Sequence, residues 1–518
     1  MFSTVTTGMV CGIRSFLVQA EVDTAAGFPC FQMVGYLGSE VKEAKERVGV
    51  ALKNAGIKLP PMHITVNLAP ADLRKEGNAY DLPIAVGIMK SLGILKEEST
   101  EGMLVIGELG LSGEVKKVKG ILPIVRKAKE EGIAYCLVPK ENEKEAAVIH
   151  GIRVIGVSHI AQVLQCLRKE EGKERQERKW RTSEENRPEA AENSFDFRED
   201  FSDLNGQAVL RRAAEVAAAG FHHLLLIGPP GAGKTMTAKR IPTILPPLTE
   251  EESMEVSTIY SVAGMLSEEL PLITKRPFLS PHHTISPQAL AGGGRFPKPG
   301  VISLAHRGVL FLDELPEFSK TAIDILRQPL EEKQIHIARS SGTFMYPADC
   351  MFVGAMNPCP CGNYPDLNKC GCTPYEVQRY LGHISGPVLD RVDICVEAPK
   401  VSFHELTGTT VQNESSARIR ERVIRARIIQ EKRYREIGHK FNSELTVGEI
   451  RHFCILEGKE KAFMEKIFEK MDLSARAYHR ILKVARTIAD LEGEEKIGKT
   501  HLSEAVFYRN AEQKYFRK

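Results

Sequence analysis

The chain has 518 residues, which at about 150 residues per domain suggests about three domains, each large enough to bury a core. Its 42% hydrophobic and 26% charged residues are typical of ordinary folded domains and exclude a disulfide-stapled miniprotein. The 70 basic and 67 acidic side chains give a formal net charge of +3, which is too small for the whole molecule to act as a polycation. Any contact with nucleic acid therefore requires a local basic surface.

The amino terminus shows no targeting or membrane signal. Residues 1–14 lack the basic flank, apolar stretch and cleavage site of a secretory leader. No apolar run approaches the roughly 20 residues that span a bilayer. We therefore expect a cytoplasmic protein with no membrane partner, in which the 11 cysteines are mostly reduced.

Short apolar runs alternate with helix-like stretches in residues 1–167. Residues 63–68 and 104–107 have the composition of buried strands, whereas 39–55 and 121–131 read as helices. This pattern predicts a compact α/β domain. Residues 168–197 are almost wholly polar and cannot repay the entropy of ordering, so we interpret them as a linker.

A complete phosphate-binding signature follows the linker. The apolar run 223–227 is typical of a buried parallel strand, and it leads into a glycine-rich loop that opens a helix. Glycines let backbone N–H groups curl around phosphate oxygens, and the lysine of the signature reaches the β and γ phosphates. The sequence predicts an ATP and Mg²⁺ site formed by Gly228, Pro229, Pro230, Gly231, Ala232, Gly233, Lys234 and Thr235, with Thr235 as a Mg²⁺ ligand.

Two acidic residues end the next strong strand. The apolar run 309–312 is followed by Asp313 and Glu314. We expect Asp313 to hold Mg²⁺ through water and Glu314 to act as the general base of hydrolysis. An Asp-Glu pair after a strand is weak evidence alone, but behind a phosphate loop it favours a nucleotide hydrolase.

Two further polar residues complete the predicted chemistry. Asn357 follows the apolar run 350–355, and from that strand end its amide could orient the attacking water. Arg391 follows a loop and could reach the γ-phosphate of a neighbouring subunit as an arginine finger. The alternative for Arg391 is a salt bridge to Asp390 or Asp393.

Four cysteines lie close together in the sequence after Asn357. Cys359 and Cys361 form one close pair, and Cys370 and Cys372 form a second. Four thiolates could close a tetrahedral structural Zn²⁺ site. One intervening residue instead of the usual two leaves a second interpretation open, namely four reduced thiols in a loop rich in proline and glycine.

The remainder of the chain, from about residue 413, reads as nearly all helix. The stretch 415–437 is rich in arginine, which suggests either contact with nucleic-acid phosphates or pairing along the helix and across subunits.

Together, these motifs resemble the AAA+ superfamily, in particular its magnesium-chelatase-like branch typified by ComM and YifB. Residues 67–77, 356–362, 384–387 and 473–482 carry the finer resemblance. It implies an α/β fold with a P-loop NTPase core at 198–402 and a helical lid at 403–518. It also implies a homohexameric ring with ATP at each subunit boundary, where Arg391 acts on the neighbouring subunit.

The resemblance assigns further residues. Arg476 would be the sensor arginine of the lid and contact the nucleotide of its own subunit, with Arg480 as its rival. The branch carries inserted segments that line the central pore, here within 281–296, and a second hairpin is suggested by 334–339 and 343–346, joined by 340–342. The adjacent His282 and His283 lack supporting acids or cysteines and are interpreted as polar loop residues.

The amino-terminal domain, residues 1–167, is similar to the proteolytic domain of Lon. Ile84 stands where the nucleophilic serine is expected, and Ile124 where the lysine is expected. A hydroxyl nucleophile needs an adjacent base, so this domain is predicted to be an inactive Lon-like domain with a ring-building or DNA-contacting role.

The family resemblance implies a DNA motor. We expect an ATPase that loads on single-stranded or branched DNA and drives branch migration in recombination or natural transformation. The alternative is a chelatase-type or protein-remodelling ATPase that acts on a protein partner.

Overall fold

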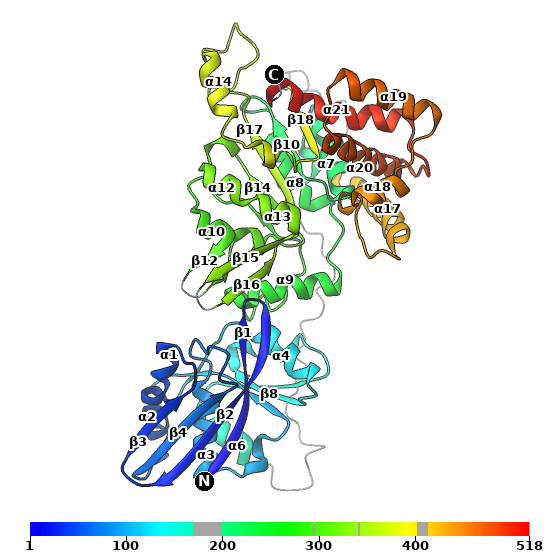
Figure 1. Cartoon of the computed structure of the whole chain (residues 1–518). Helices are drawn as coiled ribbons and strands as arrows, with labels where there is room; N and C mark the ends of the chain where they lie inside the picture. Colours follow the sequence, from blue (N-terminus) through cyan, green and yellow to red (C-terminus); the bar gives the residue numbers. More distant parts are fainter. Residues whose placement is uncertain (169–197, 295–296, 340–341, 401–412, 517–518) are drawn as a thin grey trace.

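The computed structural model describes residues 1–168, 198–294, 297–339, 342–400 and 413–516 (Figure 1). The predicted linker, apart from Arg168, and two residues of the predicted hairpin turn, Ser340 and Ser341, lie outside the described residues. Within those residues, no helix is both long and apolar enough to cross a membrane.

The amino-terminal unit is built on a seven-stranded sheet. Its order is β3 (Cys30–Val34), β4 (Met62–Ala69), β2 (Arg14–Ala26), β1 (Phe2–Cys11), β5 (Met103–Val105), β8 (Tyr135–Pro139) and β9 (Arg153–Val157). Alternate residues of β2, including Val18, Ala20 and Val22, are fully buried, as expected for a strand with one face on the core. Helices α2 (Ala44–Asn54), α3 (Asp81–Ser91), α4 (Ile121–Glu130) and α6 (Ile160–Arg168) complete this α/β unit.

The two positions predicted to correspond to the catalytic serine and lysine of Lon are buried hydrocarbon in this chain. Ile84 in α3 is 0% exposed, and Ile124 in α4 is 2% exposed. Ile124 lies so close to β1 that a Cβ atom at Gly8 would be 2.3 Å from its Cγ2. The isoleucines therefore belong to the core, with no hydroxyl or amine at either position.

The second sheet is parallel and has five strands. Its order is β11 (Phe278–Leu279), β14 (Val309–Leu312), β17 (Met351–Met356), β10 (Leu224–Ile227) and β18 (Ile394–Glu397). All four residues of β10 are buried, which explains their continuous apolar run. Because the strands are parallel, the segments that follow β10, β14 and β17 meet at one edge of the sheet.

Two short hairpins extend from this core. The predicted second hairpin is confirmed as β15 (Gln334–Arg339) paired antiparallel with β16 (Gly342–Pro347). The other hairpin pairs β12 (Gly292–Gly293) with β13 (Lys298–Pro299). The hydroxyl of Tyr346 donates to the carbonyl oxygen of Pro297 at 2.6 Å, which joins the two hairpins.

The carboxy-terminal part is helical, as predicted. It contains α17 (Ser416–Tyr434), α18 (Val447–Phe453), α19 (Gly458–Lys470), α20 (Ala475–Glu492) and α21 (Lys499–Phe516). Three arginines of α17 bond within the chain: Arg422 to Glu215 at 2.5 Å, Arg427 to the carbonyl oxygen of Ala218 at 2.8 Å, and Arg433 to Asp490 at 2.9 Å. These three side chains bond to other helices of their own chain, which disfavours phosphate contact for them and differs from the expected pairing along the helix and across subunits.

Helix α9 (Glu250–Ala263) joins the Lon-like unit to the nucleotide-binding core. It follows the P-loop helix α8 (Lys234–Ile244) in the chain and packs on α4 of the Lon-like unit (Figure 1). The backbone N–H of Gly120 donates to the carbonyl oxygen of Ser261 at 3.0 Å, and the Ser261 hydroxyl donates to Glu145 at 2.5 Å. The two units therefore share a buried polar contact.

Candidate nucleotide site and cysteine cluster

The P-loop connects β10 to α8. Gly231 and Gly233 both have a φ of +76°, a left-handed conformation that glycine adopts without strain. At Gly228, a Cβ atom would lie 2.7 Å from the carbonyl oxygen of Ala398, so the loop also needs glycine for close approach. Backbone conformation and close packing thus explain why these positions of the loop are glycine. The loop leads directly into the N-terminus of α8.

Lys234 is brought to the end of β17. Its Nζ donates to the carbonyl oxygens of Gly228 at 2.6 Å and Pro229 at 2.9 Å, and to Oδ1 of Asn357 at 3.0 Å. Burial lowers the pKa of Lys234 to about 8, while the nearby carboxylates of Asp313 and Glu314 oppose that shift. The structure therefore joins the predicted phosphate lysine to the predicted water-orienting asparagine.

The two predicted Mg²⁺ ligands face each other. The hydroxyl of Thr235 donates to Oδ2 of Asp313 at 2.7 Å, and Oδ1 of Asp313 accepts from the backbone N–H of Glu314 at 3.0 Å. Hydroxyl and carboxylate oxygens are the hard ligands that Mg²⁺ prefers, usually together with water and phosphate oxygens. The donor set fits a Mg²⁺ ion bound together with a nucleotide.

Glu314 stands beside the metal ligands in a left-handed conformation with a φ of 52°, and its side chain is 59% exposed. Its Oε2 lies 3.6 Å from Nδ1 of His283. Sequence reasoning missed this neighbour and treated His283 as a loop residue. The available signal was its position shortly after β11, the strand next to β14.

The three arginines considered for the site, Arg391, Arg476 and Arg480, lie together and away from the P-loop. Arg391 donates to the carbonyl oxygen of Pro387 at 2.6 Å and forms an ion pair with Glu331. This partner differs from both alternatives considered from sequence, because Asp390 pairs with Arg476 at 3.6 Å and Asp393 lies 3.7 Å from Arg480.

Arg391, Arg476 and Arg480 line one hollow of about 540 Å³, and no P-loop residue contributes to its lining. Burial lowers the pKa of Arg391, and the positive charges of Arg476 and Arg327 lower it further. The buried Nε of Arg391 has no hydrogen-bond partner among the described residues. The structure therefore places Arg476 beside Arg391, and among the described residues no contact supports its expected approach to the P-loop of its own subunit.

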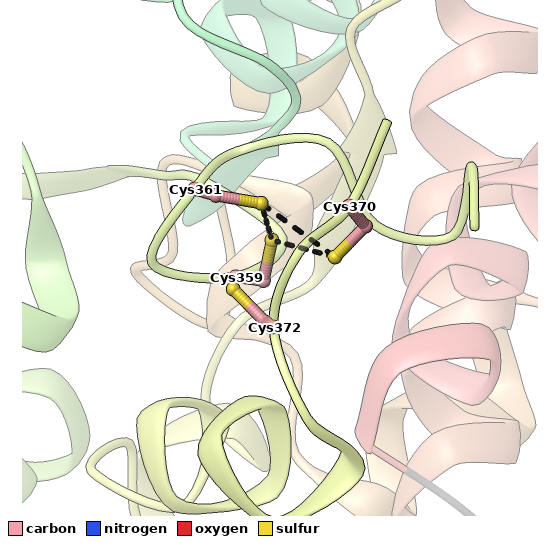
Figure 2. Close-up of side chains that lie close together, drawn as sticks. All are labelled: Cys359, Cys361, Cys370 and Cys372. Atoms are coloured by element: carbon pink, nitrogen blue, oxygen red, sulfur yellow. Dashed lines mark hydrogen bonds between the residues drawn. The ribbon is translucent and has the colours of Figure 1, made fainter. Parts of the chain in front are cut away.

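The four predicted cysteines converge. Their sulfur atoms all lie within 4.8 Å of one another (Figure 2). The Sγ of Cys359 is 3.4 Å from that of Cys361 and 3.8 Å from that of Cys370. Four sulfur donors at one point suit a soft or borderline metal ion such as Zn²⁺. The cluster can therefore hold a metal.

Known proteins match this chain over nearly its whole length. Three family models match it: "Magnesium chelatase, subunit ChlI" at 200–406, "Subunit ChlI of Mg-chelatase" at 20–142, and "Magnesium chelatase, subunit ChlI C-terminal" at 413–509. The competence protein ComM of Haemophilus influenzae is 42% identical over 504 residues, which cover 96% of this chain and 95% of ComM. The chain belongs to the ComM and YifB family of magnesium-chelatase-like AAA+ proteins. The family resemblance inferred from sequence is thereby confirmed.

Two further relatives support the ComM and YifB assignment and the fold. YifB of Escherichia coli is 42% identical over 507 residues, covering 98% of this chain and 97% of YifB. Lon protease 2 of Bacillus subtilis is 29% identical over 127 residues, 24% of this chain and 22% of that protein. The predicted AAA+ core preceded by a Lon-like α/β domain is thus confirmed, and membership of the AAA+ family indicates ATP and Mg²⁺ as ligands.

Proposed function

We propose that this protein is a cytoplasmic homohexameric ATPase that moves single-stranded or branched DNA through its ring and drives branch migration in recombination or natural transformation. One observation carries the ATPase part of the proposal. Two hydrogen-bonded pairs, Lys234 with Asn357 and Thr235 with Asp313, lie at one edge of the parallel sheet, and the backbone N–H of Glu314 donates to Asp313.

The same residues account for hydrolysis of ATP. The P-loop N–H groups and Lys234 would hold the β and γ phosphates, while Thr235 and Asp313 would hold Mg²⁺, which supplies charge neutralisation of the phosphates. Asn357 orients a water molecule toward the γ-phosphorus. Glu314 accepts a proton from that water as the new P–O bond forms and the bond to the β-phosphate oxygen breaks.

A second subunit would complete each site. Arg391 and Arg476 lie together and apart from the P-loop of their own chain, and the buried Nε of Arg391 has no partner among the described residues. The guanidinium groups of Arg391, Arg476 and Arg327 are neighbours, and an anion placed between them would replace their present carboxylate partners, Glu331, Asp390 and Asp324. In the proposed ring, that anion is the γ-phosphate of the adjacent subunit.

The proposal of DNA as the polymer rests on the relatives and on the hairpins. ComM is named for competence, and it covers nearly the full length of this chain. On the hairpins, the side chains of Lys298, His336 and Arg339 are exposed. The exposed lysine and arginine on these strands suit the phosphate backbone of a nucleic-acid strand.

The test compares ATP hydrolysis without DNA and with single-stranded, forked and duplex DNA, and measures strand displacement on labelled forks. We expect stimulation by DNA and displacement of a strand, both abolished by Lys234→Ala. Hydrolysis that no DNA stimulates, together with an absence of displacement, would contradict the DNA part of the proposal and leave the ATPase part standing.

The family models favour one alternative, because all three take their names from a magnesium chelatase subunit. In that case the ATPase would act on a protein partner. ATP-dependent remodelling of a protein client, with DNA inert in the same assay, would support this second function.

For the cysteine cluster, the metal we propose is structural Zn²⁺, held by Cys359, Cys361, Cys370 and Cys372. The support is the convergence of four sulfur atoms within 4.8 Å. Mass spectrometry of the native protein should find one zinc per chain. The double variant Cys361→Ser, Cys370→Ser should lose this zinc. A metal-free native protein purified with zinc present would refute this assignment.

A further inference from the structure

The cysteine cluster adjoins the nucleotide site through Asn357. Its loop, residues 358–373, begins directly after Asn357, the residue whose Oδ1 accepts a hydrogen bond from Lys234 at 3.0 Å. Cys359 follows two residues later and is 0% exposed. The backbone N–H of Tyr364 donates to its sulfur at 3.4 Å, which folds the loop back over this cysteine. Any ion held by Cys359 is therefore anchored two residues from Asn357.

The middle of the loop rests on the P-loop. Gly362 has a φ of +76°, and a Cβ atom there would lie 2.4 Å from Cδ of Pro230 and 3.0 Å from its Cγ. Contacts below 3.0 Å force one partner to move. Glycine at this position thus allows the cysteine loop to lie directly against the phosphate-binding loop.

The helix that follows the loop returns to Asn357. Cys372 immediately precedes Thr373, the N-cap of helix α14 (Pro374–Leu381), which has a capping box with Glu376. Tyr380 in this helix is 9% exposed. Burial raises the pKa of Tyr380, and the backbone amide of Asn357, which faces its hydroxyl, opposes that shift. Helix α14 therefore packs its tyrosine against the backbone of Asn357.

A metal ion that closes the loop would link the contacts of the loop with Asn357 and Pro230. The chain from 358 to 373 has no helix or strand of its own, so only turn hydrogen bonds and side-chain packing offset the entropy of ordering this loop. A metal ion bound by all four cysteines would fix both ends and the position of Gly362 at once. Loss of the ion would release Asn357 and remove the support behind Pro230.

We infer that the four-cysteine loop, closed by a bound metal ion, positions Asn357 and the P-loop at Pro230 for ATP hydrolysis, so that turnover depends on metal occupancy. The inference rests on the proposed ATPase function. The cysteines touch no reacting atom in this scheme and act as positioning residues. The loop is then a metal-dependent control element of the nucleotide site.

The first test changes the loop contact and keeps every cysteine. Gly362→Ala places a methyl group against Pro230, whereas Gly438→Ala has a nearly equal φ of +75° and nothing within 4 Å of its Cβ. Both variants carry the strain of a positive φ, so their difference reports the contact with the P-loop. We expect both to retain one zinc per chain, and Gly362→Ala alone to lower ATP turnover at least tenfold and to weaken binding of a fluorescent ADP analogue. Equal behaviour of the two variants would overturn the inference.

The second test removes the metal from the full-length protein with a zinc chelator and then restores Mg²⁺ and, separately, Zn²⁺. We expect turnover and affinity for the ADP analogue to fall together and to return only with Zn²⁺, while circular dichroism shows the helices retained. Stripped protein that turns over ATP and binds the analogue as well as the loaded protein would refute the inference.

The two readouts separate failure of this inference from failure of the proposed function. If the loaded protein hydrolyses no ATP under any condition, the proposed function fails, and analogue affinity with and without zinc still decides whether the loop supports the P-loop. If the loaded protein hydrolyses ATP, turnover decides the role of the loop for Asn357.

Discussion

A mixing experiment tests whether each ATP site is shared between two chains. Lys234→Ala removes the phosphate lysine and leaves Arg391 in place, and Arg391→Ala does the reverse. The two side chains belong to separate parts of one chain, since no P-loop residue lines the hollow around Arg391. Each variant alone should therefore lose activity at every site, and the loss for a finger arginine is about 10³-fold or more.

Mixed rings should regain activity. With equal amounts of the two variants, an interface can pair four combinations of chains, and one of them has both an intact Lys234 and an intact Arg391. Independent sites would thus give up to about one quarter of the parent rate, against a background about 10³-fold lower. Phosphate release at constant total protein, after co-expression of the two chains, measures this recovery.

The matched control mixes parent chains with the double variant that lacks both side chains. It also leaves one combination in four intact, so it should reach the same rate as the first mixture if the sites act independently. Recovery in the control without recovery in the first mixture would show that Lys234 and Arg391 serve the same chain. Parent-like turnover by Arg391→Ala alone would show that this arginine is no finger.

Two further predictions concern His223, which lines the hollow around Arg391, and His283, which lies beside Glu314. Burial lowers the pKa of His223 from 6.5 to about 4, so the unfolded chain binds the proton first as the pH falls. The free energy of unfolding, measured by urea denaturation, should drop by up to about 3 kcal/mol between pH 6.5 and 4. The variant His223→Asn keeps a hydrogen-bond acceptor and should not show this drop. His283→Ala should raise phosphate release several-fold, because it frees Glu314 from the contact at 3.6 Å, and His282→Ala should not; equal rates for the two variants would contradict a restraint on the glutamate.

Local motifs allowed much of the nucleotide site to be predicted. The P-loop is continuous in sequence, and Asp313 and Glu314 follow a strand of recognisable composition. Asn357 could be added because parallel strands bring their carboxyl ends to one edge, and it contacts Lys234 across 123 positions of the chain. These features depend on short-range sequence patterns and on one general rule of sheet topology.

Other features depend on how whole elements pack, and local patterns do not encode that packing. The position of Arg476 follows from helix α20, which packs against α7 (Ala208–Gly220) and α17. The arginines of α17 look like a basic surface in sequence, yet Arg427 is 5% exposed because α7 covers it and accepts its hydrogen bonds. The contact between His283 and Glu314 likewise joins two loops that only the sheet order brings together.

The same packing explains how the nucleotide site can act on the Lon-like unit. Helix α9 follows the P-loop helix in the chain, and at its end Ser261 donates a hydrogen bond to Glu145 of the Lon-like unit at 2.5 Å. Burial raises the pKa of Glu145, and the Ser261 hydroxyl opposes that shift. Separation of the two units would remove this hydrogen bond and leave Glu145 with its donors inside the Lon-like unit, Asn142 and the backbone N–H of Leu122, at a cost of about 1 kcal/mol. In the proposed ATP cycle, a displacement of α8 and α9 should therefore move the Lon-like unit as well, although isoleucines occupy the positions predicted for its peptidase residues.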